Sequence, residues 1–103
     1  MTREECISIC QECLVECRNC MVKQAGQETN NDCPECCMNC AEACLACINM
    51  LAMDSQWSKD YCKICAEICD WCANQCGEHD HDHCQKCAES CRKCAEACRA
   101  YAA

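Results

Sequence analysis

The spacing of its cysteines constrains this chain more than any other feature. From residue 84 to residue 98 the sequence reads CQKCAESCRKCAEAC, so cysteines recur at alternating steps of three and four residues. This rhythm averages 3.5 residues and places every cysteine of the segment on one straight face of an α-helix. The residues between them are Ala, Glu, Lys, Arg, Gln and Ser, most of which favour helix. The segment is therefore predicted to be a helix whose inner face consists of thiols.

The same spacing occurs in three other segments, so that 20 of the 21 cysteines lie on four such lines, which we call seams. In chain order the seams are Cys6, Cys10, Cys13, Cys17 and Cys20; Cys33, Cys37, Cys40, Cys44 and Cys47; Cys62, Cys65, Cys69, Cys72 and Cys76; and Cys84, Cys87, Cys91, Cys94 and Cys98. Cys36 alone falls beside its seam, and we expect it to border the inner face.

Capping patterns and breaks predict where the four helices begin and end. Thr2 with Glu5, and Asp32 with Glu35, have the spacing of a capping box. Asp54-Ser55 reads as a short break followed by a cap. We therefore expect helices over about residues 3–25, 33–53, 56–76 and 81–101 of a single domain spanning residues 1–103. Short connections between helices of this length predict an all-α fold, an antiparallel four-helix bundle with a cysteine-lined core.

Composition supports a core made of sulfur. Ile, Leu and Val together number ten and Phe is absent, so an ordinary apolar core is not available. Cysteine can replace it because a free thiol behaves as a small hydrophobe. The net charge of −8 argues against nucleic acid as a partner and predicts a solvated acidic surface.

The N-terminus predicts a cytoplasmic protein. MTREECISIC lacks the apolar stretch of an export signal, and no run of about 18 apolar residues predicts a membrane span. In a reducing compartment a high density of cysteine indicates metal binding rather than disulfides. An odd number of cysteines also cannot pair completely within one chain.

Antiparallel helices predict which side chains meet at each end of the bundle. One end should collect Cys20, Cys33, Cys76 and Cys84 with His79, His81 and His83. The opposite end should collect Cys6, Cys47, Cys62 and Cys98 with Met50, Met53, Trp57 and Tyr101. The first end is expected to be polar and the second apolar and plugged. We interpret Met50 and Met53 as residues that fill the core in preference to metal ligands. The histidines fit a solvated turn and an entry route for a metal ion equally well.

A continuous array of thiols suits Cu(I), because soft thiolate ligands select this ion and can bridge neighbouring metals. Zinc needs four ligands set apart as one closed site, and iron–sulfur clusters need discrete sets of four, whereas this spacing isolates no four cysteines. One Cu(I) per thiolate also leaves a buried core neutral, which predicts about 20 Cu(I) per chain. Binding must release a similar number of protons, since buried thiols stay protonated without metal.

The repeats CAEAC (40–44 and 94–98), CAEIC (65–69) and CAESC (87–91), together with CGEHDHDHCQKC (76–87), resemble the bacterial copper storage proteins over nearly the whole chain. The similarity is greatest to the branch without an export signal. It implies a cytosolic four-helix bundle, often a homotetramer, that stores Cu(I) and is not an enzyme. The resemblance makes the seam cysteines the ligands. It places the route of copper at His79, His81 and His83. From its position near the histidine end, Cys36 is expected to be a ligand of second rank. The full second seam and Cys36 depart from the family pattern and leave the stoichiometry open.

Two other classes of function remain open. The first is a metallothionein-like zinc or cadmium buffer, which a preference for zinc at full loading would favour. The second is a thiol-redox protein, which normally needs one exposed thiolate of lowered pKa, and no pair among these cysteines stands out as such. A persulfide store has no feature that supports it. As a copper store, the chain would receive Cu(I) from small thiols or a copper chaperone.

Overall fold

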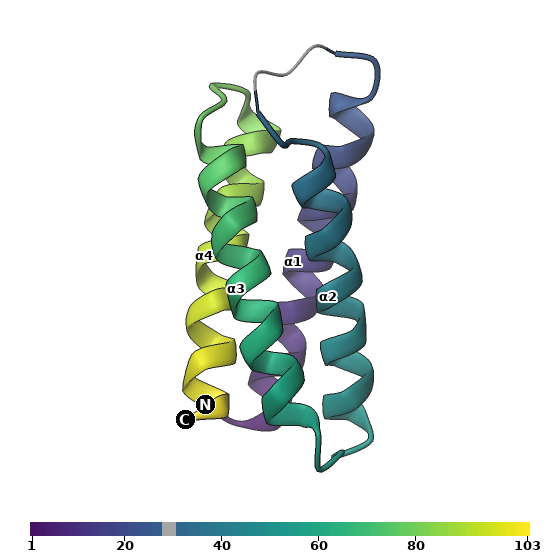
Figure 1. The fold of residues 1–103 in the computed structure, drawn as a ribbon, viewed down its shortest axis with the longest axis vertical. Coiled ribbons are helices and arrows are strands. Elements are labelled where there is room, and N and C mark those ends of the chain that lie inside the picture. The colour runs from purple at the N-terminus through teal and green to yellow at the C-terminus, as the bar shows by residue number, and fades with distance from the viewer. Residues whose placement is uncertain (28–30) are drawn as a thin grey trace.

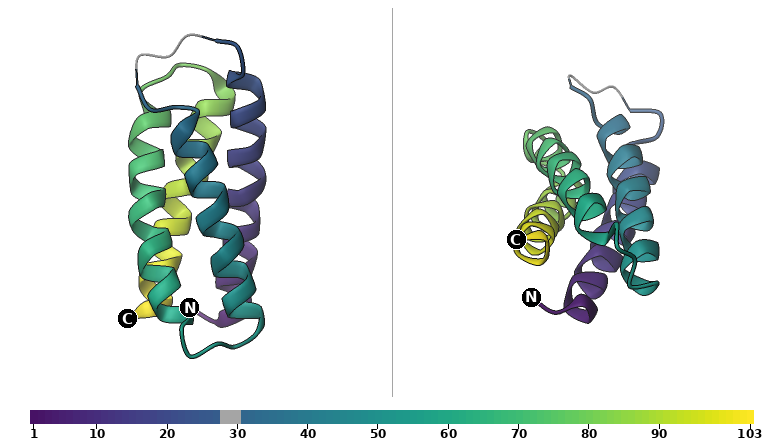
Figure 2. Two further views of the ribbon diagram at one scale, coloured as in Figure 1. Left: turned by 45° about the vertical axis from the view of Figure 1, so that its right-hand side comes forward. Right: turned by 60° about the horizontal axis from the view of Figure 1, so that its bottom comes forward.

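The computed structural model describes residues 1–27 and 31–103, and over these residues the chain forms four α-helices with short connections (Figure 1). Their bounds are Arg3–Gln24 for α1, Glu35–Ala52 for α2, Ser58–Gly77 for α3 and Asp82–Ala102 for α4. Successive helices run antiparallel, and each packs against two neighbours to form a bundle of 41 × 18 × 17 Å (Figure 2). Both termini lie at one end of the bundle, and the α3–α4 connection lies at the other (Figure 1). The predicted fold class is confirmed.

The first helix begins and ends as its sequence predicts. The Thr2 side chain accepts from the Glu5 backbone N–H, and the Glu5 carboxylate accepts from the Thr2 N–H, so the capping box is present. The helix ends at Gln24, and Gly26 follows with φ +82°, a left-handed conformation that favours glycine. The predicted end at residue 25 is therefore correct to within one residue.

The start of α2 corrects the prediction made for Asp32 and Glu35. The first residue of α2 is Glu35, and its N-cap residue, Pro34, makes no side-chain hydrogen bond to the helix. The Asp32 backbone is used differently: its carbonyl accepts from the Cys36 N–H at 2.9 Å, and its N–H donates to Gln75 Oε1 on α3 at 2.9 Å. A local backbone bond and a contact with α3 thus take the place of the expected capping box, and the helix begins two residues later than expected.

The connection between α2 and α3 contains the predicted break. Asp54 has φ 51°, which ends the helical path, and Ser55 Oγ accepts from the Trp57 N–H at 3.1 Å. The third helix begins at Ser58, two residues after the predicted start, and its N-cap residue Trp57 makes no side-chain cap. Residues 56 and 57, which were expected to begin the third helix, thus belong to the connection between α2 and α3.

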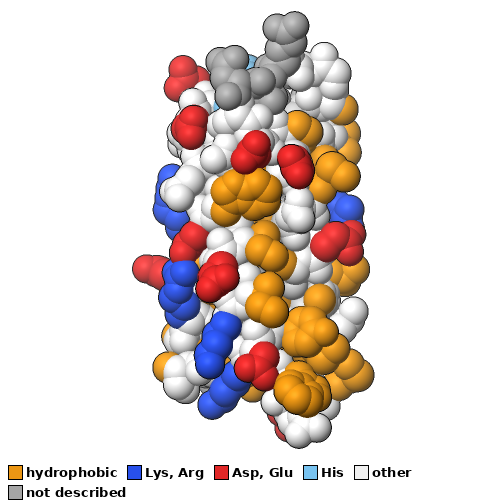
Figure 3. Space-filling model, viewed as in Figure 1, with side chains coloured by type: hydrophobic (Ala, Val, Ile, Leu, Met, Phe, Trp, Pro, Cys, Tyr) orange, Lys and Arg blue, Asp and Glu red, His pale blue; other side chains and the backbone are white. Residues whose placement is uncertain are grey.

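Cysteine and alanine make up nearly all of the buried interior, with Leu51 as the one larger apolar side chain that is fully buried among the described residues. Ile7, Leu14, Met21 and other half-buried apolar residues pack around this interior. On the outside, Figure 3 shows acidic and basic side chains spread over the face that α2 and α3 form, with hydrophobic side chains along its middle. The predicted solvated, charged surface is therefore present on this face.

Of the described helices, α2 alone is long and apolar enough to cross a membrane by length and composition, with a mean hydropathy of 1.2 over Glu35–Ala52. Its cysteines, Ala41 and Leu51 are buried inside the bundle. A helix whose apolar side chains are buried in the core of a globular bundle has the same length and hydropathy.

Candidate metal-binding core

All 21 cysteines are buried and free, and none is more than 1% exposed. Each seam faces the axis of the bundle, as the heptad spacing predicts. The register between helices also agrees with the antiparallel prediction, because Cys20 on α1 meets Cys84 on α4 at an Sγ–Sγ distance of 3.8 Å. At the opposite end, Cys47 on α2 meets Cys62 on α3 at 3.3 Å. The interior is therefore one column of thiols.

The sulfur atoms form a continuous network along this column. In the middle of the bundle, Cys13 Sγ lies 3.8 Å from Cys40 Sγ and 3.8 Å from Cys91 Sγ, so three helices meet there. The α2–α3 interface holds the shortest of these distances: 3.4 Å for Cys37–Cys76, 3.4 Å for Cys40–Cys69 and 3.3 Å for Cys47–Cys62. A metal ion placed between any of these helices has several sulfur ligands within reach.

Groups of four thiols within 4.8 Å of one another recur along the column, and they overlap. Five of these groups are Cys10, Cys47, Cys65 and Cys98; Cys13, Cys40, Cys44 and Cys69; Cys13, Cys17, Cys40 and Cys91; Cys17, Cys72, Cys87 and Cys91; and Cys20, Cys37, Cys76 and Cys87. Among these five groups, five cysteines occur twice: Cys13, Cys17, Cys40, Cys87 and Cys91. Separate, closed zinc sites each need four ligands of their own. Overlapping groups instead suit Cu(I), because one thiolate can bridge two neighbouring Cu(I) ions.

Cys36 lies in the core despite its position beside the seam. Its thiol is fully buried, and its Sγ lies 3.9 Å from Cys76 Sγ. Cys76 Sγ is also 3.9 Å from Cys33 Sγ and 3.4 Å from Cys37 Sγ. Two thiols from the first turn of α2 and one from the segment just before it thus gather around one thiol at the end of α3. The sequence placed Cys36 at the border of the inner face, and the structure places it inside.

The three histidines lie at the end predicted for them but have different surroundings. His83 is half-buried, and its Nδ1 lies 3.5 Å from Cys84 Sγ. The exposed His81 ring stacks on the His83 ring with centroids 5.3 Å apart. His79 is half-buried, and its Nε2 bonds to Asn31 Oδ1 at 2.9 Å. Of the three, His83 is the one that the structure brings to a core thiol.

The opposite end differs from the expectation of a plug built from Met50, Met53, Trp57 and Tyr101. Met53 is 65% exposed and Trp57 is 57% exposed, so these two side chains do not fill the core. Leu51 fills this end instead, and it is fully buried. The interpretation of Met53 as core packing is wrong, because the chain turns away from the bundle at Asp54 directly after it.

One functional candidate that the sequence analysis missed is Gln24. It lies four residues after Cys20, so it continues the first seam by one step, and it is 2% exposed. Its Nε2 donates to Cys84 Sγ at 2.9 Å. Gln24 could have been predicted from the heptad spacing. One further step of the first seam beyond Cys20 leads to residue 24, which closes the end of the bundle.

The electrostatics of the core favour neutral contents. Among the described residues, the buried polar side chains are Gln24 and Ser58, so no buried lysine or arginine is available to balance thiolate charge. Burial, followed by the neighbouring Cys20 thiol, raises the pKa of Cys84 to about 12. The Cys84 thiol therefore stays protonated at neutral pH until a metal displaces the proton.

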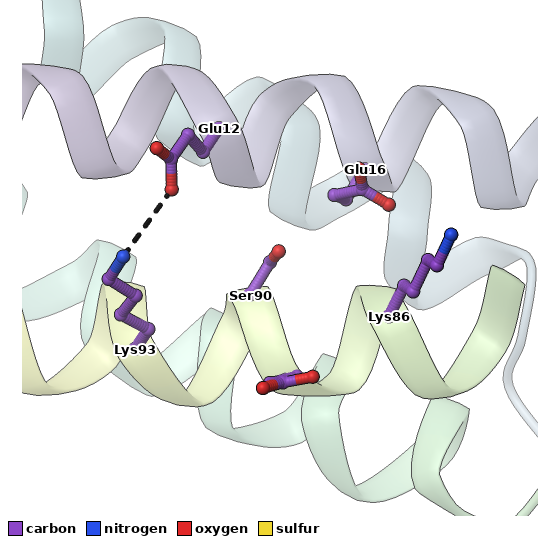
Figure 4. Close-up of a pocket in the computed structure, with 6 residues that line it drawn as sticks. Glu12, Glu16, Lys86, Ser90 and Lys93 are labelled. Atoms are coloured by element: carbon purple, nitrogen blue, oxygen red, sulfur yellow. Dashed lines mark ion pairs between the residues drawn. The ribbon is translucent and has the colours of Figure 1, made fainter. Parts of the chain in front are cut away.

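One surface groove, between α1 and α4, lies apart from the thiols. A groove of about 220 Å³ between α1 and α4 is lined by Glu12, Glu16, Lys86, Glu89, Ser90 and Lys93 (Figure 4). Within it, Lys93 Nζ lies 3.5 Å from Glu12 Oε2. Because no cysteine lines this groove, it is separate from the sulfur column and offers no route into it.

Known proteins share this architecture. A Cu(I)-bound copper storage protein, BsCsp3, is 39% identical with a TM-score of 0.93, and the match covers 97% of each chain. The apo form of copper storage protein 3 from Bacillus subtilis is 40% identical with a TM-score of 0.94, over 99% of this chain and 100% of that one. A protein from Nitrosospira multiformis is 35% identical with a TM-score of 0.84, over 97% and 94%.

Sequence comparisons agree with the structural ones. The uncharacterised cysteine-rich protein YhjQ of Bacillus subtilis (strain 168) is 43% identical over 56 residues, which is 54% of this chain and 52% of YhjQ. The match thus spans about half the length of that curated relative. The family described as Csp, copper storage protein, matches residues 1–103. Because the family match covers every residue of the sequence, the chain belongs to the copper storage protein family.

Proposed function

We propose that this chain stores Cu(I) as thiolate clusters inside the bundle and thereby keeps the ion from harmful redox chemistry. One observation carries the proposal: 21 thiols lie buried in one connected column with no buried cation among the described residues to balance them. One Cu(I) per thiolate keeps such a column neutral, and the overlapping groups of four suit bridging ligands. Membership of the family and the similarity to Cu(I)-bound BsCsp3 support the same function.

The proposed ligands are the 20 seam cysteines, with Cys36 as a further ligand beside Cys76. Among the histidines, His83 is the best candidate for a route to the core, since its Nδ1 lies 3.5 Å from Cys84 Sγ. His79 and His81 are proposed to attract Cu(I) to this end rather than to hold it. Storage of this kind requires no catalytic step, so we propose that the protein is not an enzyme.

Further parts of the proposal rest on the family rather than on the geometry. They are a cytoplasmic location, delivery of Cu(I) by small thiols or a copper chaperone, and assembly as a homo-oligomer, with a tetramer as the expected form. Exposed apolar residues on α2 and α3, such as Met38, Leu45 and Ile64, agree with a face that binds other subunits. Light scattering during size-exclusion chromatography measures this assembly directly.

The test of the storage function is an anaerobic titration of the reduced protein with Cu(I) against a chromogenic chelator. We expect the chelator to gain copper only after about 20 Cu(I) per chain are bound, one per thiol. Replacement of the seam cysteines by serine should abolish this capacity and leave helical circular dichroism.

The titration also separates copper storage from the zinc-buffer alternative. Saturation by about five zinc ions per chain, with only a few Cu(I) bound, would favour a zinc buffer, because 21 thiols make about five sites of four ligands. Full copper capacity in the serine variant would contradict the assignment of the ligands.

A further inference from the structure

The two ends of the sulfur column are closed by residues of different character. One turn beyond the last cysteine at the end that holds the termini, Leu51 is 0% exposed and Ser58 is 3% exposed. Leu51 has no polar group, and Ser58 Oγ donates to the Met50 carbonyl at 3.0 Å, so neither offers a polar group to the thiols. At the other end the corresponding residue on α1 is Gln24, which is 2% exposed and carries an amide.

The Gln24 amide contacts the thiol that connects the histidine end to the core. Gln24 Nε2 lies 2.9 Å from Cys84 Sγ. The same sulfur lies 3.5 Å from His83 Nδ1 and 3.8 Å from Cys20 Sγ. An ion that moves from the His83 imidazole to the Cys20 and Cys84 thiols therefore has to use a sulfur to which Gln24 already donates a hydrogen bond.

We propose that Gln24 is a gate residue, whose side chain closes the histidine end and swings aside when Cu(I) passes between His83 and the Cys20–Cys84 pair. The inference rests on the proposed storage function. A single neutral hydrogen bond can break and re-form readily. Gln24 is also the last residue of α1, so no further turn of this helix lies beyond it. Displacement of Leu51 at the other end would instead expose an apolar core side chain to water, which costs more free energy than breaking one hydrogen bond.

The test compares rates of copper transfer in both directions. Loading is followed from a Cu(I)–chelator complex, and removal is followed with excess chelator, for the wild-type protein and Gln24→Ala. A gate sets the height of a barrier without changing the end states. We therefore expect both rates to rise by about fivefold to tenfold, as for the loss of one hydrogen bond, while capacity and affinity stay constant.

Two control variants separate a gate from a general loosening of the bundle. Gln27→Ala removes an exposed glutamine of the same region whose Nε2 donates to the Lys23 carbonyl at 3.1 Å, and its rates should equal those of the wild type. Leu51→Ala loosens the opposite end, and its transfer rates should also stay near those of the wild type.

Three results would overturn the gate. They are unchanged rates in Gln24→Ala, an equal acceleration in Leu51→Ala, and a faster removal with a weaker affinity, which would make Gln24 part of the copper site. The wild-type titration keeps this test distinct from that of the storage function. A wild-type chain that binds few Cu(I) ions would contradict storage and the gate together. Unchanged rates in variants that fill normally would contradict the gate alone.

Discussion

The number of sulfur neighbours differs among the cysteines, and this difference should appear in the copper content. Cys91 Sγ lies within 4.0 Å of the thiols of Cys13, Cys17, Cys40 and Cys87. Cys36 Sγ has one such contact, with Cys76 at 3.9 Å. A bridging thiolate binds more than one Cu(I), so its loss should remove more than one ion. We expect Cys36→Ala to lower the capacity by about one Cu(I) and Cys91→Ala by about two or more.

Native mass spectrometry of the copper-saturated variants measures these capacities ion by ion. Circular dichroism at 222 nm provides the control, since alanine preserves helix and both variants should stay folded. An equal loss in the two variants would mean that Cu(I) does not bridge thiolates in the middle of the column. Such a result would be compatible with copper storage but would contradict the proposal that neighbouring Cu(I) ions share thiolate ligands.

At the scale of the helices, the two predicted capping boxes give a matched pair of variants. Thr2 caps α1 through its side chain, whereas Asp32 contributes only backbone groups to the start of α2. Thr2→Ala should therefore lower the free energy of unfolding by about 1 kcal/mol, and Asp32→Ala should change it much less. Thermal denaturation of the reduced apo protein measures both values. A larger loss in Asp32→Ala than in Thr2→Ala would show that an Asp32 side-chain cap forms in solution.

For the whole molecule, the buried thiols predict how the stability of the apo protein depends on pH. The pKa of Cys84 is raised to about 12, above the ordinary value of about 8.5 for an exposed thiol. A raised pKa in the folded state stabilises the bundle fully below pH about 8.5, and this contribution is lost as pH rises towards 12. We therefore expect the reduced apo protein to be helical at pH 7 and to melt at least about 5 °C lower at pH 10.5.

Anaerobic melting curves followed by circular dichroism between pH 7 and pH 10.5 test this prediction. The copper-loaded protein is the control, because its thiols have already lost their protons and its melting temperature should change less over the same range. A random-coil spectrum at pH 7 would contradict a prefolded apo bundle. A constant melting temperature up to pH 10.5 would contradict the loss of stability through thiol ionisation.

The sequence alone determined the fold and most of the candidate site, because both depend on periodicity. Steps of three and four residues place a side chain on one helix face whatever its neighbours are, so the seams and the bundle could be predicted without coordinates. The ends of the bundle depend on contacts between residues far apart in the chain, and only the tertiary structure decided them. It placed Gln24 on Cys84, drew Cys36 in beside Cys76, and left Met53 in solvent. The connections between helices have no periodic spacing from which such contacts could be predicted. The seams therefore follow from local helix geometry, whereas the residues that close the ends of the bundle follow from tertiary packing.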